Sequence, residues 1–162
     1  MDTTYNALFL CTGNSARSQM AEVLLNAMGQ GHFRAYSAGS HPSGEVHPLA
    51  LQTIRDFGLG AETLRSKSWN EFAGPAAPTM DFVITVCDKA AGESCPVWPG
   101  HPAMAHWGVP DPAASGDPHA FRDAWLTLRR RIELMLALPL HTLDKMAREQ
   151  RLNAIADEGS TS

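Results

Sequence analysis

The segment from Cys11 to Arg17 has the composition of a loop that binds a tetrahedral oxyanion. Gly13, Asn14 and Ser15 suit the tight, partly positive-φ turns in which successive backbone N–H groups point toward an anion. Arg17 supplies a planar guanidinium that can hold two oxygen atoms at once. We predict that Cys11 attacks the central atom of the bound anion as a thiolate. The expected anion-binding residues are Thr12, Gly13, Asn14, Ser15, Ala16 and Arg17.

The elements on either side favour this interpretation over an ordinary turn. The apolar run at residues 7–10 predicts a buried strand, and residues 18–28 carry apolar side chains at helical spacing. A helix that begins near Ser18 directs its N-terminal dipole at the loop, which stabilises both an anion and a thiolate. The Ser18 hydroxyl is expected to donate to the Cys11 sulfur. The alternative is that Cys11 is only a buried residue at a strand end, and the position of Arg17 disfavours it.

The remaining sequence predicts strands that alternate with helices. Strands are expected at 33–38 and 82–86, a brief extended segment at 104–107, and helices at 48–57, 119–138 and about 143–155. Ser68 is expected to cap a short helix, with Glu71 as its capping-box partner. The alternation predicts an α/β fold whose parallel sheet is covered on both faces. Cys11, Cys87 and Asp111 each follow a candidate strand, so they are expected at the same edge of the sheet.

The composition indicates one domain, and we expect a single catalytic domain over residues 1–138, followed by a helical extension and flexible tail at 139–162. The chain has 162 residues, 44% of them hydrophobic, which is enough for one core. Its formal net charge of −4 gives no reason to expect nucleic acid or an anionic membrane as a partner. Because it shows no signal peptide and no apolar stretch of roughly 20 residues, we expect a cytoplasmic protein. Three cysteines without a Cys-x-x-Cys pair predict buried or reactive thiols rather than structural disulfides.

Residues 10–22, Leu-Cys-Thr-Gly-Asn-Ser-Ala-Arg-Ser-Gln-Met-Ala-Glu, resemble the active-site segment of the low-molecular-weight tyrosine phosphatase superfamily, and more closely its arsenate reductase branch. Gln19 distinguishes the branch, because phosphatases of that fold usually have proline at this position. The similarity continues at 37–39, 85–88, 95–96 and 106–113, and covers roughly residues 7–138. It implies a three-layer, doubly wound parallel sheet of four strands, a flavodoxin-like arrangement. The segment after Pro139 lies beyond the resemblance, and the amphipathic stretch at about 143–155 predicts an extra C-terminal helical segment there.

The resemblance also implies a relay of three thiols. Cys11 would attack arsenate, held by Arg17 and assisted by Ser18, while Asp111 at the family's general-acid position protonates the departing oxygen. Cys87 would then attack Cys11 and expel arsenite. Finally, Cys95 would attack Cys87, and thioredoxin, or glutathione with glutaredoxin, would reduce the Cys87–Cys95 disulfide. No cofactor or metal ion is implied.

A phosphatase is the main alternative. Such an enzyme would hydrolyse phospho-Cys11 with water and leave the other two thiols idle. Ala113 disfavours it, because the phosphatases typically place an aromatic residue after the Asp-Pro pair, where it flanks an aryl substrate. A non-catalytic oxyanion-binding module is a third hypothesis, which requires Arg17 but neither Cys11 nor Asp111.

Two further patterns receive ordinary structural interpretations. Cys87, Cys95, His101 and His106 could be considered a zinc set, but their spacing fits no common finger. The basic run at residues 129–131 is expected on the solvated face of a helix.

Overall fold

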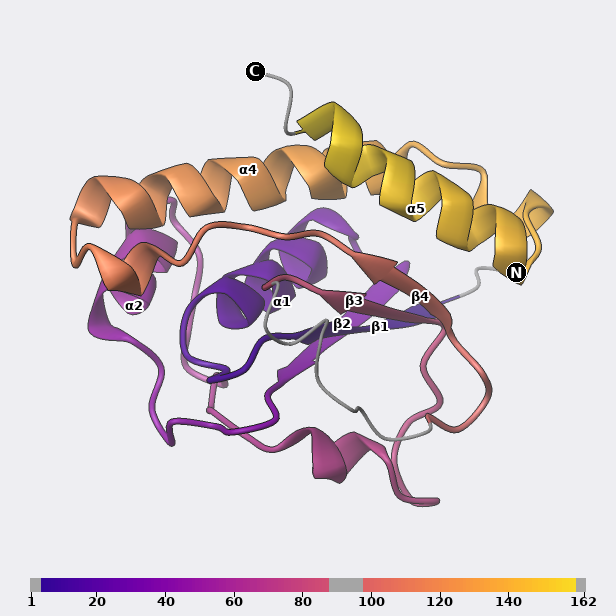
Figure 1. Cartoon of the computed structure of the whole chain (residues 1–162), viewed down its shortest axis with the longest axis horizontal. Coiled ribbons are helices and arrows are strands. Elements are labelled where there is room, and N and C mark those ends of the chain that lie inside the picture. The colour runs from indigo at the N-terminus through magenta and orange to yellow at the C-terminus, as the bar shows by residue number, and fades with distance from the viewer. Residues whose placement is uncertain (1–3, 88–97, 160–162) are drawn as a thin grey trace.

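Figure 1 shows a sheet of parallel strands at the centre of the molecule, in the order β2-β1-β3-β4. The strands are β1 (Tyr5–Leu10), β2 (Phe33–Ala38), β3 (Phe82–Thr85) and β4 (Ala103–His106). The computed structural model describes residues 4–87 and 98–159. The two central strands, β1 and β3, are dominated by apolar residues, as buried parallel strands require. The brief extended segment near residue 104 is therefore a full member of the sheet.

The two faces of the sheet are covered differently. The α-helices are α1 (Arg17–Met28), α2 (Pro48–Asp56), α4 (Pro118–Leu136) and α5 (Lys145–Gly159), and all of them contribute to the core on the face that holds Phe9. Leu8 and Leu10 point the other way, because side chains alternate along a strand. They pack with Phe72 of the short 3₁₀ helix η1 (Trp69–Phe72) and with Trp98. The predicted three-layer α/β fold is confirmed.

The cap of η1 differs in part from the prediction. Ser68 accepts a hydrogen bond from the Asn70 N–H at 3.1 Å, as expected of a helix cap. The capping-box partnership predicted for Glu71 is wrong, since its two carboxylate oxygens accept hydrogen bonds from Arg65 at 2.6 and 3.0 Å. A bidentate guanidinium–carboxylate pair is stronger than one bond to a backbone N–H, so it determines where Glu71 points.

Helix α5 occupies the outer edge of β4. The N–H groups of Met104 and His106 point away from β3, and they donate to the side chains of Glu149 at 2.8 Å and Asn153 at 2.9 Å. Leu152, between these two side chains, is fully buried in the main core. The C-terminal extension thus packs against the sheet. Its last residues, 160–162, lie outside the described part of the chain.

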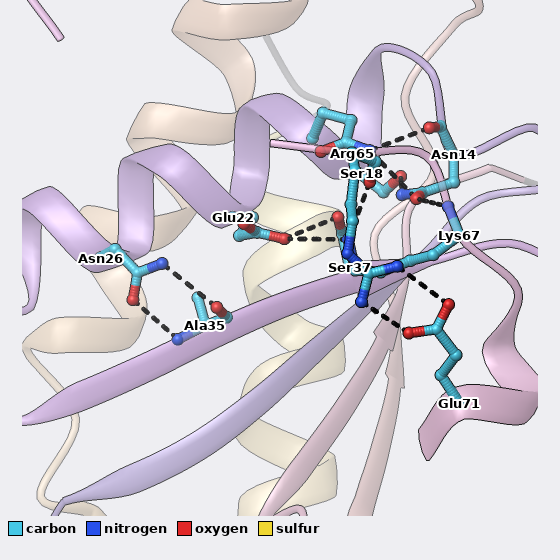
Figure 2. Close-up of polar contacts among 10 residues, drawn as sticks. Asn14, Ser18, Glu22, Asn26, Ala35, Ser37, Arg65, Lys67 and Glu71 are labelled. Carbon is cyan, nitrogen blue, oxygen red and sulfur yellow. Dashed lines mark hydrogen bonds and ion pairs between the residues drawn. The ribbon is translucent and has the colours of Figure 1, made fainter. Parts of the chain in front are cut away.

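The opposite edge of the sheet is held by α1. Asn26 accepts from the Ala35 N–H at 2.8 Å and donates to the Ala35 carbonyl at 3.1 Å, as Figure 2 shows. Beyond the end of β2, Gly39 bonds to the backbone of Lys67 and Trp69 at 3.0 and 2.9 Å. This bridge brings the 65–69 segment beside the loop that follows β1. Within residues 4–87 and 98–159, no helix has the length and apolar character needed to cross a membrane.

Candidate active site

The loop after β1 turns carbonyl groups outward. The carbonyls of Thr12, Gly13 and Ser15 accept hydrogen bonds from backbone N–H groups of the 41–47 segment at 2.8 to 2.9 Å. In a trans peptide the N–H and the carbonyl point in opposite directions, so the N–H group of each following residue points inward. Converging N–H groups of this kind form an anion-binding nest.

Asn14 holds this loop in shape from the inside. It is fully buried, has a positive φ of 45°, and donates to the Ser18 hydroxyl at 2.8 Å. Its side-chain oxygen accepts from the Lys67 N–H at 2.9 Å (Figure 2). Gln19 donates to the same oxygen and to the Asn14 carbonyl at 3.0 Å, and to the Arg65 carbonyl at 2.8 Å. A glutamine at position 19 therefore ties the loop to the 65–67 segment, which a proline could not do.

Gly39 allows β2 to support the loop at close range. A Cβ atom at this position would lie 2.6 Å from the Cys11 carbonyl oxygen and would also collide with the Thr12 carbonyl. Backbone atoms cannot move aside as a flexible side chain can. Only glycine fits here, and any larger residue would displace the loop that carries Cys11.

A buried ion pair lies beneath the loop. Glu22 accepts from the Ser37 hydroxyl at 2.8 Å, and its carboxylate is 3.7 Å from the ammonium of Lys67, which also donates to the Arg65 carbonyl at 2.9 Å (Figure 2). The two charged side chains are only 13% and 7% exposed. Burial raises the pKa of Glu22 and lowers the pKa of Lys67, while the opposite charge of each partner counteracts both shifts. The charged forms of Glu22 and Lys67 beneath the loop therefore stabilise each other.

The sulfur atoms of Cys11 and Cys87 are neighbours. Both residues are buried, and the Thr12 N–H donates to the Cys87 sulfur at 3.4 Å. The sequence predicts a lowered pKa for Cys11, whereas the structure gives the opposite direction. A hydrogen bond with Cys87 and then burial raise the pKa of Cys11, and together they outweigh the charge of Arg17 and the Thr12 N–H. The second thiol, which lies outside the loop, is the main cause of this difference.

Arg17 connects the loop to the segment that carries Asp111. It donates to the Val109 carbonyl at 2.8 Å, and its second terminal nitrogen is 3.8 Å from the Asp111 carboxylate. The same carboxylate oxygen accepts from the Ala113 N–H at 3.0 Å, which begins the 3₁₀ turn η2 (Pro112–Ala114). Asp111 is half exposed, so it lies at the rim of the site.

A cavity of about 1020 Å³ opens at this edge of the sheet. It is lined by Cys11, Thr12, Gly13, Ser15, Ala16, Arg17, Cys87, Gly108, Val109, Pro110, Asp111, Ala113, Thr127 and Arg131. The predicted meeting of Cys11, Cys87 and Asp111 at one edge is thus observed. The hydrogen bond predicted from Ser18 to the Cys11 sulfur stays a prediction, and Cys95 lies outside the described residues.

Arg131 lines the cavity, so the prediction that the 129–131 run lies on the solvated face of α4 is wrong at this residue. Only 4% of Arg131 is exposed. Arg131 lies within the apolar stripe of the helix. The stripe includes Leu128, three residues before it, and Ile132 and Met135, one and four residues after it, and all three are buried. Helical spacing could therefore have identified it, had its charge not suggested solvent.

The fold and the site together define a class. A cysteine and an arginine enclose an anion nest at the carboxyl edge of a parallel sheet, which is the arrangement of a phosphatase-type loop. A family model described as low molecular weight phosphotyrosine protein phosphatase matches residues 6–150, and the chain belongs to this family.

Several proteins to which this chain is similar are arsenate reductases. The arsenate reductase of Shouchella clausii is 34% identical over 122 residues, which make up 75% of this chain and 83% of the relative. A structure of an arsenate reductase in the phosphate binding state has a TM-score of 0.67 at 26% identity, covering 83% of this chain and 98% of that one. The thioredoxin-dependent arsenate reductase of Corynebacterium glutamicum has a TM-score of 0.61 at 26% identity, covering 81% of this chain and 59% of that one.

Proposed function

We propose that this protein is an arsenate reductase that uses Cys11 as nucleophile and Cys87 as the second thiol. The observation that carries the proposal is the second sulfur: Cys87 accepts the Thr12 N–H at 3.4 Å, is hydrogen-bonded to Cys11, and lines the same cavity. Hydrolysis of a phosphate ester needs no such thiol, whereas reduction of an oxyanion needs two electrons. The arsenate reductases among its relatives support the same conclusion.

The first step forms a bond between the Cys11 sulfur and arsenic. The anion binds in the nest with Arg17, and the Cys11 thiolate attacks arsenic while an oxygen leaves as water after receiving a proton from Asp111. An anion that bridges the nest and Arg17 lies within reach of the half-exposed carboxyl at the rim. This step changes no oxidation state, because arsenic remains pentavalent in the adduct.

The second step transfers two electrons. The Cys87 thiolate attacks the Cys11 sulfur, the sulfur–sulfur bond forms, and the electron pair of the sulfur–arsenic bond stays with arsenic, which leaves as trivalent arsenite. In the absence of an anion, the hydrogen bond with Cys87 and burial hold the pKa of Cys11 above its ordinary value.

Regeneration requires an external reductant. In the proposed cycle Cys95 attacks Cys87, and a cytoplasmic dithiol protein reduces the resulting disulfide. Thioredoxin is our first expectation, since one relative of similar fold is thioredoxin-dependent. Glutathione with glutaredoxin is the second.

The test is to mix the reduced protein with arsenate and measure arsenite and free thiols. The wild type should lose two thiols for each arsenite formed. Cys87→Ser should form no arsenite, although Cys11 can still form its adduct. Arsenite formation by Cys87→Ser at the wild-type rate would refute the relay.

A phosphatase assay distinguishes the proposed arsenate reductase from the alternative, a phosphatase. Ala113 lines the cavity with a methyl group and cannot stack on an aryl ring, so aryl phosphate hydrolysis should be slow. Rapid hydrolysis without any arsenite would instead favour the phosphatase. Cys11→Ser should abolish both activities, and full cellular function of that variant would indicate a non-catalytic oxyanion-binding module. Running the assay with thioredoxin, and then with glutathione and glutaredoxin, identifies the reductant.

A further inference from the structure

Arg131 places a buried positive charge in the wall of the cavity. Its guanidinium donates to the Gly108 carbonyl at 3.0 Å, and only 4% of the residue is exposed. Thr127, one turn earlier on α4, also lines the cavity, so this face of the helix is turned toward the site. The neighbouring Arg130 is exposed to solvent.

This charge has no acidic partner in the part of the chain that the structure describes. The ion pairs found there join other residues, and the Nε atom of Arg131 is buried without a hydrogen-bond partner. Burial lowers the pKa of Arg131, and no carboxylate opposes that effect. Arginine nevertheless stays charged in proteins. A buried cation without a counter-charge is costly, and an anion in the cavity that Arg131 lines would supply the counter-charge.

Two arginines hold adjacent carbonyls of one segment. Arg17 binds the Val109 carbonyl and Arg131 binds the Gly108 carbonyl, and this segment leads directly to Asp111. The charge of Arg17 is partly balanced by Asp111 at 3.8 Å, whereas that of Arg131 is not. The wall of the cavity therefore carries more positive charge than the loop itself supplies.

We propose that Arg131 is a second oxyanion-recognising cation of this site, which strengthens binding of the doubly charged anion. This role of Arg131 rests on the proposed function only for the identity of the substrate. The binding of a tetrahedral anion does not depend on it. Arg131 acts by its charge, and its bond to Gly108 holds the guanidinium in place.

The test uses inorganic phosphate, titrated calorimetrically into the reduced full-length protein. Arg131→Gln, which can still donate to Gly108 but lacks the charge, should weaken phosphate binding about 10- to 100-fold, the range expected for one charge-assisted contact. Arg130→Gln removes the same charge from the exposed neighbouring position and should change the affinity little. In arsenate turnover, Arg131→Gln should raise KM more than it lowers kcat.

Arg131→Lys provides a second test that does not depend on the stability of the glutamine variant. A buried lysine loses its proton at lower pH than an arginine does, so its phosphate affinity should fall at alkaline pH more steeply than that of the wild type. Parallel pH profiles for the two proteins, or an Arg131→Gln protein that binds phosphate as well as Arg130→Gln, would overturn the proposal. Phosphate binding by a wild type that makes no arsenite would refute the proposed function and leave this inference intact.

Discussion

Replacing Lys67 by methionine should destabilise the protein by removing one half of the buried ion pair. At 3.7 Å and an effective dielectric constant of about 20, the Lys67–Glu22 attraction is about 4.5 kcal/mol. Removing one partner of a buried pair typically costs about 3–5 kcal/mol, because the other charge stays buried alone. For a chain of this length we expect a loss of roughly 10 °C in melting temperature.

The loss should depend on pH with a definite sign. Without Lys67, the pKa of Glu22 rises further above its ordinary value of 4.5, because burial is no longer opposed by the ammonium. The folded variant then holds a proton that the unfolded chain has released, so its stability falls as pH rises from about 4.5 and is lowest above the folded pKa. The deficit relative to the wild type should therefore be larger at pH 7.5 than at pH 5.5.

Urea unfolding, followed by the fluorescence of the four tryptophans, measures the free energy of unfolding of the variant and the wild type at both pH values. The double variant Glu22→Gln/Lys67→Met leaves no uncompensated charge and should recover more than half of the loss. Arg65→Gln is the matched control, because its pair with Glu71 is exposed and such pairs contribute about 0–1 kcal/mol. If Lys67→Met costs no more than Arg65→Gln and shows no dependence on pH, the buried pair does not support the loop.

Two further substitutions test the catalytic rim and the C-terminal helix. Asp111→Asn keeps an acceptor for the Ala113 N–H but has no proton to give, so kcat for arsenate should fall about 10²–10⁴-fold with little change in KM, and an unchanged kcat would exclude Asp111 as the general acid. Leu152→Ala removes a fully buried side chain of α5 and should cost about 2–5 kcal/mol in urea unfolding, whereas Leu126→Ala, at an exposed position, should cost far less; equal costs would contradict the packing of α5 on the core.

Local patterns were sufficient for the elements that carry the chemistry. The apolar run ending at Leu10, the glycine-containing loop and the helix that begins at Arg17 are all encoded within one short stretch of sequence. Because parallel strands meet at one edge, the order of elements also predicted that Cys87 and Asp111 would join Cys11.

Contacts between distant residues could not be predicted in this way. The direction of the Cys11 pKa depends on a sulfur 76 positions away, and the support of the loop depends on Lys67, which no local pattern links to Asn14. Arg131 shows a different limit. Its charge suggests exposure to solvent, whereas its spacing places it among the buried residues of α4, and here the spacing gives the correct position.

The side chains that bind the two outer strands have a consequence for association. A strand with unpaired N–H and carbonyl groups is a template on which another chain can add a strand. Here the outward N–H groups of Met104 and His106 are bound by α5, and both backbone groups of Ala35 are bound by Asn26. At these positions the sheet is closed to extension, which opposes the addition of a strand from another chain at either edge.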